Sequence, residues 1–114
     1  MTTIDDYIAT QPETVRPVCI ELVAAFDTTL IRAAGTIWHG HPVWMIGKTP
    51  VAGFKAASKF VNVMIWRGQD IDAPDLTPSG SFRMANTKIT STDSLDTKQI
   101  SSWLRAAEAL EPAE

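Results

Sequence analysis

The sequence from Val51 to Trp66, VAGFKAASKFVNVMIW, holds two runs of β-branched and aromatic residues separated by a short break. The runs Val51–Lys55 and Phe60–Trp66 are typical of β-strands, and Ala57–Lys59 is typical of a turn between them. Because so few residues connect the two runs, they are expected to pair as an antiparallel hairpin and not through a parallel crossover. The second run has apolar side chains on both faces, which predicts a central strand or one partly covered on its second side.

Further strands are predicted on both sides of this hairpin. The run Val43–Ile46 has the same composition, and the turn sequence Gly47–Pro50 follows it. A later strand is predicted at Thr87–Ser91, with an earlier start near Phe82–Met84 left open. The segment Gly68–Gly80 is rich in proline, glycine and aspartate, which predicts an irregular connection. We therefore expect an antiparallel sheet of about four to five strands.

Helical signals come before and after the predicted sheet. Apolar residues recur at helical spacing between Val15 and Leu30, and Pro17 is expected in the first turn of that helix. Gly35 is a plausible stop signal for it. The order of helices, strands and a final helix predicts an α+β fold in one domain spanning residues 1–114, with the C-terminal helix packed on the sheet.

Capping sequences predict where the first and last helices begin. Thr3 and Asp6 have the spacing of a capping box, in which each side chain accepts a hydrogen bond from the other residue's backbone. Asp96 is expected to cap the closing helix, with Gln99 three residues later.

Composition excludes several classes of partner. The net charge is −3, from 10 basic and 13 acidic residues, and the basic residues are scattered along the sequence, which disfavours nucleic acid. No apolar run reaches the roughly 18–20 residues of a membrane span, so no membrane partner is expected. The acidic N-terminus is unlike a secretory signal, and the single Cys19, expected to pack as a small hydrophobe, forms no internal disulfide. We expect a cytoplasmic protein.

The stretch Trp38–Pro42, WHGHP, is the most unusual in the chain. In an extended conformation His39 and His41 would point to the same face, so their two imidazoles could converge on one metal ion, such as weakly bound iron. No third ligand is identified by its spacing. The alternative is a Gly-Pro corner between strands with two partly exposed histidines.

Tryptophans and basic residues suggest a second kind of site. Trp38, Trp44 and Trp66 could line a pocket beside the sheet, and nearby cations could bind an anion or a carboxylate at its polar end. The alternative is that the tryptophans fill the core and the basic residues lie at its rim. The predicted ligand-binding residues are Trp38, Gly40, Pro42, Trp66, Arg67, Arg83 and Lys88.

Signatures of catalysis are lacking. Ser79–Ser81 does not match a nucleophile elbow, and Asp70, Asp72 and Asp75 lack the glycine and glutamate of a calcium-binding EF-hand loop. A non-catalytic protein is therefore favoured over an enzyme that uses His39 or His41 as acid or base.

Several of these motifs together resemble the YdhG-like family, which is also catalogued as a domain of unknown function. The resemblance covers nearly the whole chain and is carried by Ile4–Ile8 (IDDYI), Trp38–Pro42 (WHGHP), Gly53–Ala56 (GFKA), Lys59–Val63 (KFVNV), Ile65–Gly68 (IWRG), Arg83–Met84 and Thr87–Ile89 (TKI).

The resemblance implies an α+β fold with N-terminal helices, an antiparallel sheet and a C-terminal helix. Some members are described as frataxin-like intracellular iron chaperones, which implies iron or other metal handling by an acidic surface near the first helix and the sheet edge. The acidic residues of that region here are Asp5, Asp6, Glu13, Glu21 and Asp27. The alternative function is a small-ligand or protein-interaction module with a tryptophan-lined pocket, and a homodimer is left open.

Overall fold

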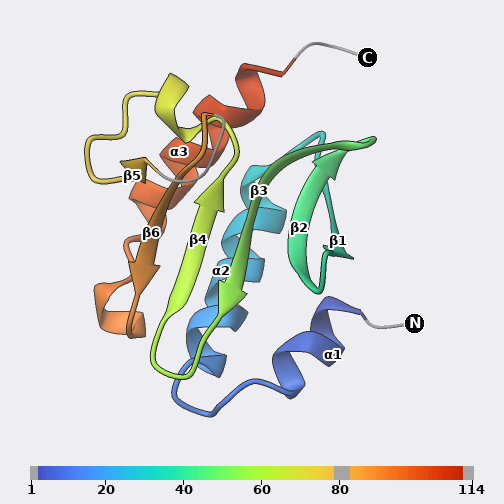
Figure 1. The fold of residues 1–114 in the computed structure, drawn as a ribbon, viewed down its shortest axis with the longest axis vertical. Coiled ribbons are helices and arrows are strands. Elements are labelled where there is room, and N and C mark those ends of the chain that lie inside the picture. Colours follow the sequence, from blue (N-terminus) through green and yellow to red (C-terminus); the bar gives the residue numbers. More distant parts are fainter. Residues whose placement is uncertain (1–2, 79–82, 112–114) are drawn as a thin grey trace.

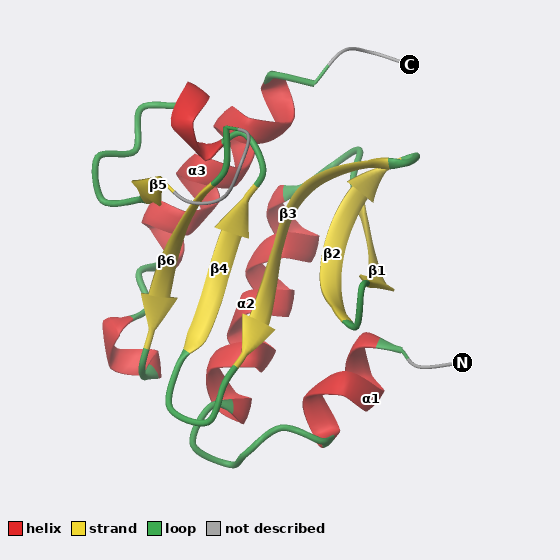
Figure 2. Cartoon of the chain, in the orientation of Figure 1, coloured by secondary structure: helices red, strands yellow, loops and turns green. Residues whose placement is uncertain are grey.

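The computed structural model of the chain describes residues 3–78 and 83–111. The elements follow one another as α1 (Ile4–Ala9), α2 (Arg16–Thr29), β1 (Ala34–Trp38), β2 (His41–Ile46), β3 (Thr49–Ala56), β4 (Val61–Ile65), the 3₁₀ turn η1 (Gly68–Asp70), β5 (Thr77–Pro78), β6 (Ala85–Ile89), the 3₁₀ turn η2 (Thr92–Ser94) and α3 (Thr97–Ala109). Figure 1 traces this order by colour, and Figure 2 separates the helices from the strands.

The six strands form one antiparallel sheet in the order β1-β2-β3-β4-β6-β5. The predicted α+β class is confirmed, and so are the two hairpins that join β2, β3 and β4. The strand count is higher than the predicted four to five, because β1 and the two-residue β5 extend the sheet at its edges. The last long strand begins at Ala85, and the alternative start at Phe82 lies outside the described residues.

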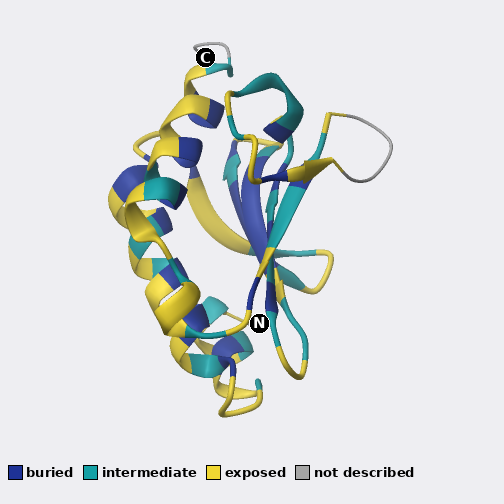
Figure 3. Cartoon of the chain, turned by 90° about the vertical axis from the view of Figure 1, so that its left-hand side faces the viewer, coloured by how far each residue is buried: buried dark blue, intermediate teal, exposed yellow. Residues whose placement is uncertain are grey.

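Helices α2 and α3 lie on one face of the sheet, as the profile in Figure 3 shows. Val61, Val63 and Ile65 of β4 are fully buried beneath them. Strand β4 pairs with β3 on one side and β6 on the other, so its predicted central position is confirmed. The opposite face, which we call the open face, has no described helix over it. No helix of the described part of the chain has the length and apolar character needed to cross a membrane.

Three aromatic rings join α2 to the sheet. Phe26 of α2 packs against Trp44 of β2 with ring centroids 4.5 Å apart, and Phe54 of β3 lies 6.1 Å from both of these rings. All three side chains are fully buried. Asp27 accepts a hydrogen bond of 2.8 Å from the indole nitrogen of Trp44, which satisfies the one polar group of this cluster.

The predicted role of Gly35 as a helix stop is wrong. Helix α2 ends at Thr29, six residues earlier, and Gly35 lies within β1 opposite Trp44. A Cβ atom at Gly35 would come within 2.8 Å of the Trp44 ring and 2.9 Å of Ile4. This position therefore needs glycine for a close approach of the indole to the backbone and not to end a helix.

The capping predictions are confirmed. Thr3 and Asp6 exchange two side-chain to backbone hydrogen bonds of 3.1 Å at the start of α1. Asp96 accepts from the backbone N–H of Gln99 at 3.1 Å, and α3 begins directly after it. Pro17 lies in the first turn of α2, where its missing N–H leaves no hydrogen bond unmade.

The buried carboxylate of Glu108 in α3 fixes the connection between α2 and β1. It accepts three backbone hydrogen bonds, from Ile31, Arg32 and Ala33, at 3.0, 2.9 and 3.0 Å. The Arg32 guanidinium donates in return to the Glu108 carbonyl oxygen at 2.6 Å. Because the acceptor is a carboxylate, these hydrogen bonds are charge-assisted and strong. They join α3 to the segment just before β1, so Glu108 holds the start of β1 against α3.

Replacing Glu108 by glutamine should therefore destabilise the fold. The amide keeps one acceptor oxygen but presents an NH₂ group to a backbone donor, and we expect a loss of about 1–3 kcal/mol in the free energy of unfolding. Urea unfolding followed by circular dichroism measures this loss. The exposed Glu21→Gln serves as control, with an expected change within about 0.5 kcal/mol. Equal stability of the two variants would contradict the role given to Glu108.

Candidate functional site

A single row of side chains crosses the open face from β1 to β6. The strand register pairs Trp38 with His41, Lys55 with Asn62, and Asn62 with Lys88. Val43 of β2 pairs with Gly53 of β3. Because the strands are antiparallel, His41, two residues before Val43, has Lys55, two residues after Gly53, as its neighbour on β3. Since adjacent strands lie about 4.8 Å apart, this row of five side chains spans about 19 Å. We call Trp38, His41, Lys55, Asn62 and Lys88 the transverse row.

Trp38 and Trp66 meet on this face with ring centroids 6.1 Å apart. They come from β1 and from the end of β4, so their side chains reach toward each other across β2 and β3. Val43 is fully buried, although no described helix covers this face. Both tryptophans keep part of their own surface exposed. Trp44, by contrast, is a core residue, so it takes no part in the predicted three-tryptophan pocket, and only Trp38 and Trp66 contact each other on the open face.

The His39–His41 segment is not extended; it forms a corner between two strands, in agreement with the alternative prediction for WHGHP. His39 and Gly40 both have positive φ, 53° and 85°, and they form the two-residue turn between β1 and β2. Positive φ at both central positions is the geometry that fits the twist of a tight hairpin. His39 is therefore exposed at the turn, while His41 and the buried Pro42 belong to β2, with Pro42 on the helix side of the sheet.

His41 is the more constrained of the two histidines. Its Nδ1 atom is shielded from solvent and has no hydrogen-bond partner in the described part of the chain. Burial lowers the pKa of His41, and the charges of Lys55 and His39 lower it further, while backbone groups of Pro42 and Phe54 act in the opposite direction. The neutral imidazole is thus favoured in the folded state.

A shallow cavity of about 300 Å³ lies at the other end of the transverse row. It is lined by Lys55, Ala56, Ala57, Phe60, Asn62 and Lys88. The Lys88 ammonium lies 4.8 Å from the centre of the Phe60 ring, a distance typical of a cation–π contact. The Asn62 Oδ1 atom is shielded from solvent without a hydrogen-bond partner among the described residues.

The charges of the chain are segregated between the sheet and the helices. The sequence has no Asp or Glu from Thr28 to Gln69 or from Leu76 to Thr92, and these two segments contain all six strands. They contain seven of the ten basic residues, namely Arg32, Lys48, Lys55, Lys59, Arg67, Arg83 and Lys88. On the open face the register places Lys55 and Lys88 in the transverse row, and no strand carries an acid to offset their charge.

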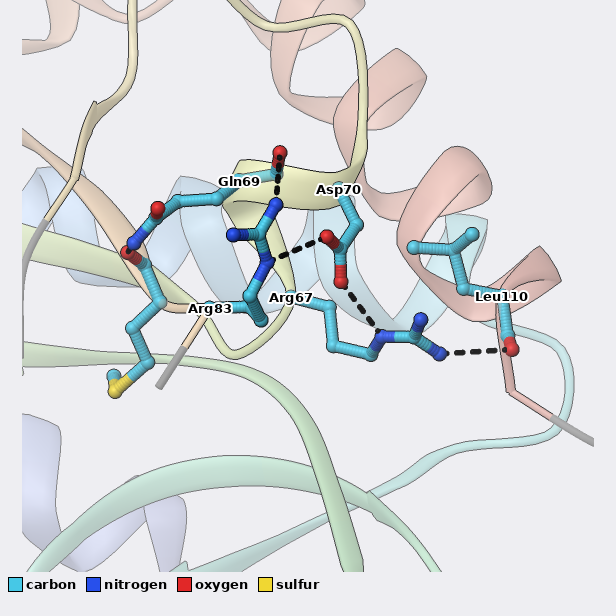
Figure 4. Close-up of polar contacts among 6 residues, drawn as sticks. Arg67, Gln69, Asp70, Arg83 and Leu110 are labelled. Carbon is cyan, nitrogen blue, oxygen red and sulfur yellow. Dashed lines mark hydrogen bonds and ion pairs between the residues drawn. The ribbon is translucent and has the colours of Figure 1, made fainter. Parts of the chain in front are cut away.

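The predicted cations do not all converge on the tryptophans. Arg67 and Arg83 both pair with Asp70, through Nε to carboxylate distances of 3.1 and 2.7 Å, and Arg67 also donates to the Leu110 carbonyl oxygen at 3.1 Å (Figure 4). Hydrogen bonds from Arg83 and Arg67 lower the pKa of Asp70. Lys88 lies toward the opposite end of the sheet, over the ring of Phe60. The three predicted cations are therefore divided between the surroundings of Asp70 and those of Phe60.

Metal-ligating groups are sparse in this region. Across residues 3–78 and 83–111, no group of three or more His, Cys, Asp or Glu side chains is arranged to hold a metal ion. Cys19 is buried in the core, as expected, and burial raises the pKa of its thiol to about 11. Such a thiol is protonated at neutral pH and inert as a nucleophile.

Scans of protein-family models, curated proteins and solved structures each find no match to this chain. The function therefore has to be inferred from the geometry of the open face.

The lowered pKa of His41 predicts a pH-dependent stability. Because the unfolded imidazole has a pKa of about 6.5, the unfolded state binds the proton more readily, so the folded state should lose stability as the pH falls below that value. Urea midpoints measured from about pH 7.5 to pH 5 should fall less steeply in His41→Asn than in the original chain. His39→Asn, at the exposed turn, is the comparison variant: it removes only one of the smaller causes of the lowered pKa, so its slope should change much less. If the urea midpoint of His41→Asn fell with pH as steeply as that of the original chain, His41 would not be the cause of the pH dependence.

Proposed function

We propose that this chain is a non-catalytic binding module whose open face takes a small anionic ligand that carries a planar group. The observation that supports it is the pair of shielded, unpartnered atoms His41 Nδ1 and Asn62 Oδ1, both in the transverse row. A shielded polar atom without a hydrogen bond costs about 1–3 kcal/mol. A ligand that reaches these two atoms and hydrogen-bonds to them would remove that cost, and this gain would favour binding.

The remaining side chains of the open face fit the same ligand class. Lys55 and Lys88 flank Asn62 and supply positive charge where no strand carries an acid. Trp38 and Trp66 offer partly exposed rings for a planar group. Charge and stacking on one face are the usual means by which a site takes a flat anion, such as an aromatic carboxylate or a nucleotide-like phosphate.

The proposal includes membership of the YdhG-like family and a cytoplasmic location. The motifs that carry the resemblance supply the open face: WHGHP contributes Trp38 and His41, GFKA contributes Lys55, KFVNV contributes Asn62, and TKI contributes Lys88. The location is supported by the single buried Cys19, since a chain with one buried thiol forms no internal disulfide.

Ligand probes that separate charge from planarity test this function. AMP carries both features, adenosine carries only the plane, and inorganic phosphate carries only the charge. We expect AMP to bind at least about tenfold more tightly than either partial probe, since both subsites then contribute. Backbone and indole N–H shifts in nuclear magnetic resonance spectra should change at Trp38, Asn62 and Lys88.

Variants that lack the lysine charges test whether AMP binds at the open face. The double variant Lys55→Gln/Lys88→Gln should weaken AMP binding at least about tenfold, and Lys98→Gln in α3 is the matched control. The absence of shifts on the open face for every probe at about 10 mM, or equal losses in both variants, would refute the proposal.

Weak metal handling is a second candidate function. The unpartnered His41 Nδ1, beside the exposed His39, is the observation that favours it, together with the family resemblance. Anaerobic titration with Fe(II), followed by calorimetry, should release heat that the double variant His39→Asn/His41→Asn lacks. No heat beyond dilution at about millimolar metal would exclude this candidate.

A further inference from the structure

The two edge strands of the sheet, β5 and β1, differ in how well they are protected from pairing with a further strand. Edge strand β5 is two residues long and ends in Pro78, which cannot donate to an added strand. Edge strand β1 is five residues long, with the sequence Ala-Gly-Thr-Ile-Trp, and has no charged residue, proline or bulge. Natural sheets normally protect an edge by one of these means, so β1 is an open template for another strand.

The outer side of β1 is available for pairing. Within residues 3–78 and 83–111, β1 pairs only with β2, and its backbone makes no other hydrogen bond. Ile31, just before the strand, is 89% exposed. In Figure 1, β1 lies at one border of the sheet with α1 near its end. An extended segment beside β1 would thus gain main-chain hydrogen bonds without displacing a described strand.

A groove of about 330 Å³ lies along β1, between that strand and helices α1 and α2. Its walls combine apolar side chains with two carboxylates and are formed by Thr3, Ile4, Asp5, Val23, Asp27, Gly35, Thr36 and Ile37. Asp5 makes no hydrogen bond or ion pair with the described residues, and one oxygen of Asp27 accepts from Trp44 at 2.8 Å. Apolar side chains beside two carboxylates fit the aliphatic stem and cationic head of lysine or arginine.

We propose that β1 binds an extended peptide segment as an added strand, and that a lysine or arginine of this segment occupies the groove beside Asp5 and Asp27. Main-chain hydrogen bonds to β1 supply the affinity, and the groove selects the cationic side chain, because alternate residues of the added strand point to its side of the sheet.

A second copy of the chain fits this groove less well. Its own β1 has no cationic side chain to offer. Pairing two β1 strands around a two-fold axis would also bring the carboxylates of both grooves toward the same junction, where like charges repel. Charge complementarity therefore favours a basic partner over self-association.

Three short peptides test the proposal on the full chain. The first is acetyl-Thr-Val-Lys-Val-Thr-amide, the second replaces lysine by glutamate, and the third is the lysine peptide with N-methyl groups on alternate amides. We expect the lysine peptide to shift and protect the backbone amides of Gly35, Thr36 and Ile37, with an affinity at least about tenfold above that of the other two.

Two neutral variants test the role of the carboxylates. Asp5→Asn should weaken binding of the lysine peptide severalfold, whereas Asp72→Asn, in an exposed loop away from β1, should leave it unchanged. Thermal unfolding of both variants checks that they fold. Equal binding of the lysine and glutamate peptides would overturn the assignment of the groove. Absence of shifts in β1 would overturn the proposal, as would a peptide-independent dimer in sedimentation that pairs β1 with itself.

Discussion

The contact of Phe26 with Trp44 and Phe54 is the interaction on which the arrangement of this molecule depends. It joins α2 to β2 and β3 from one side only, and the indole of Trp44 leaves room for nothing larger than glycine at position 35 of β1. Helical cover on one face leaves the other face to its own side chains. Trp38 and Trp66 contact each other on that face and remain partly exposed.

The elements with strong local signals could be predicted from the sequence. The β3–β4 hairpin has two runs of β-branched and aromatic residues around a short turn, and α1 and α3 begin at capping residues that act within three positions. Strand β1 could not be predicted in this way, because alanine and glycine have low β-propensity. Its position depends on Trp44 and on the Glu108 carboxylate, which contacts residues more than 70 positions earlier.

Only part of the candidate site can be predicted from the sequence, because it too depends on contacts between distant residues. Residue type alone indicates Trp38, His41 and Lys88, but it does not indicate Lys55 and Asn62, because only the register of five strands places all of them in one row. Arg67 and Arg83 are separated by 16 positions, and their shared partner Asp70 is visible only in three dimensions. One signal was available in the sequence: the absence of acids from Thr28 to Gln69 indicates a cationic sheet, although the basic residues are scattered.

Both proposed surfaces meet at β1. Trp38 contributes its ring to the open face, while the backbone of the same strand forms the free edge. A strand added at this edge would extend the sheet beside Trp38 and restrict its ring, and a planar ligand stacked on that ring would stiffen β1 in return. By linkage, any effect of one partner on the affinity for the other must be reciprocal. The opposite charges of the two surfaces, cationic on the open face and acidic in the groove, keep their partners from competing for the same place.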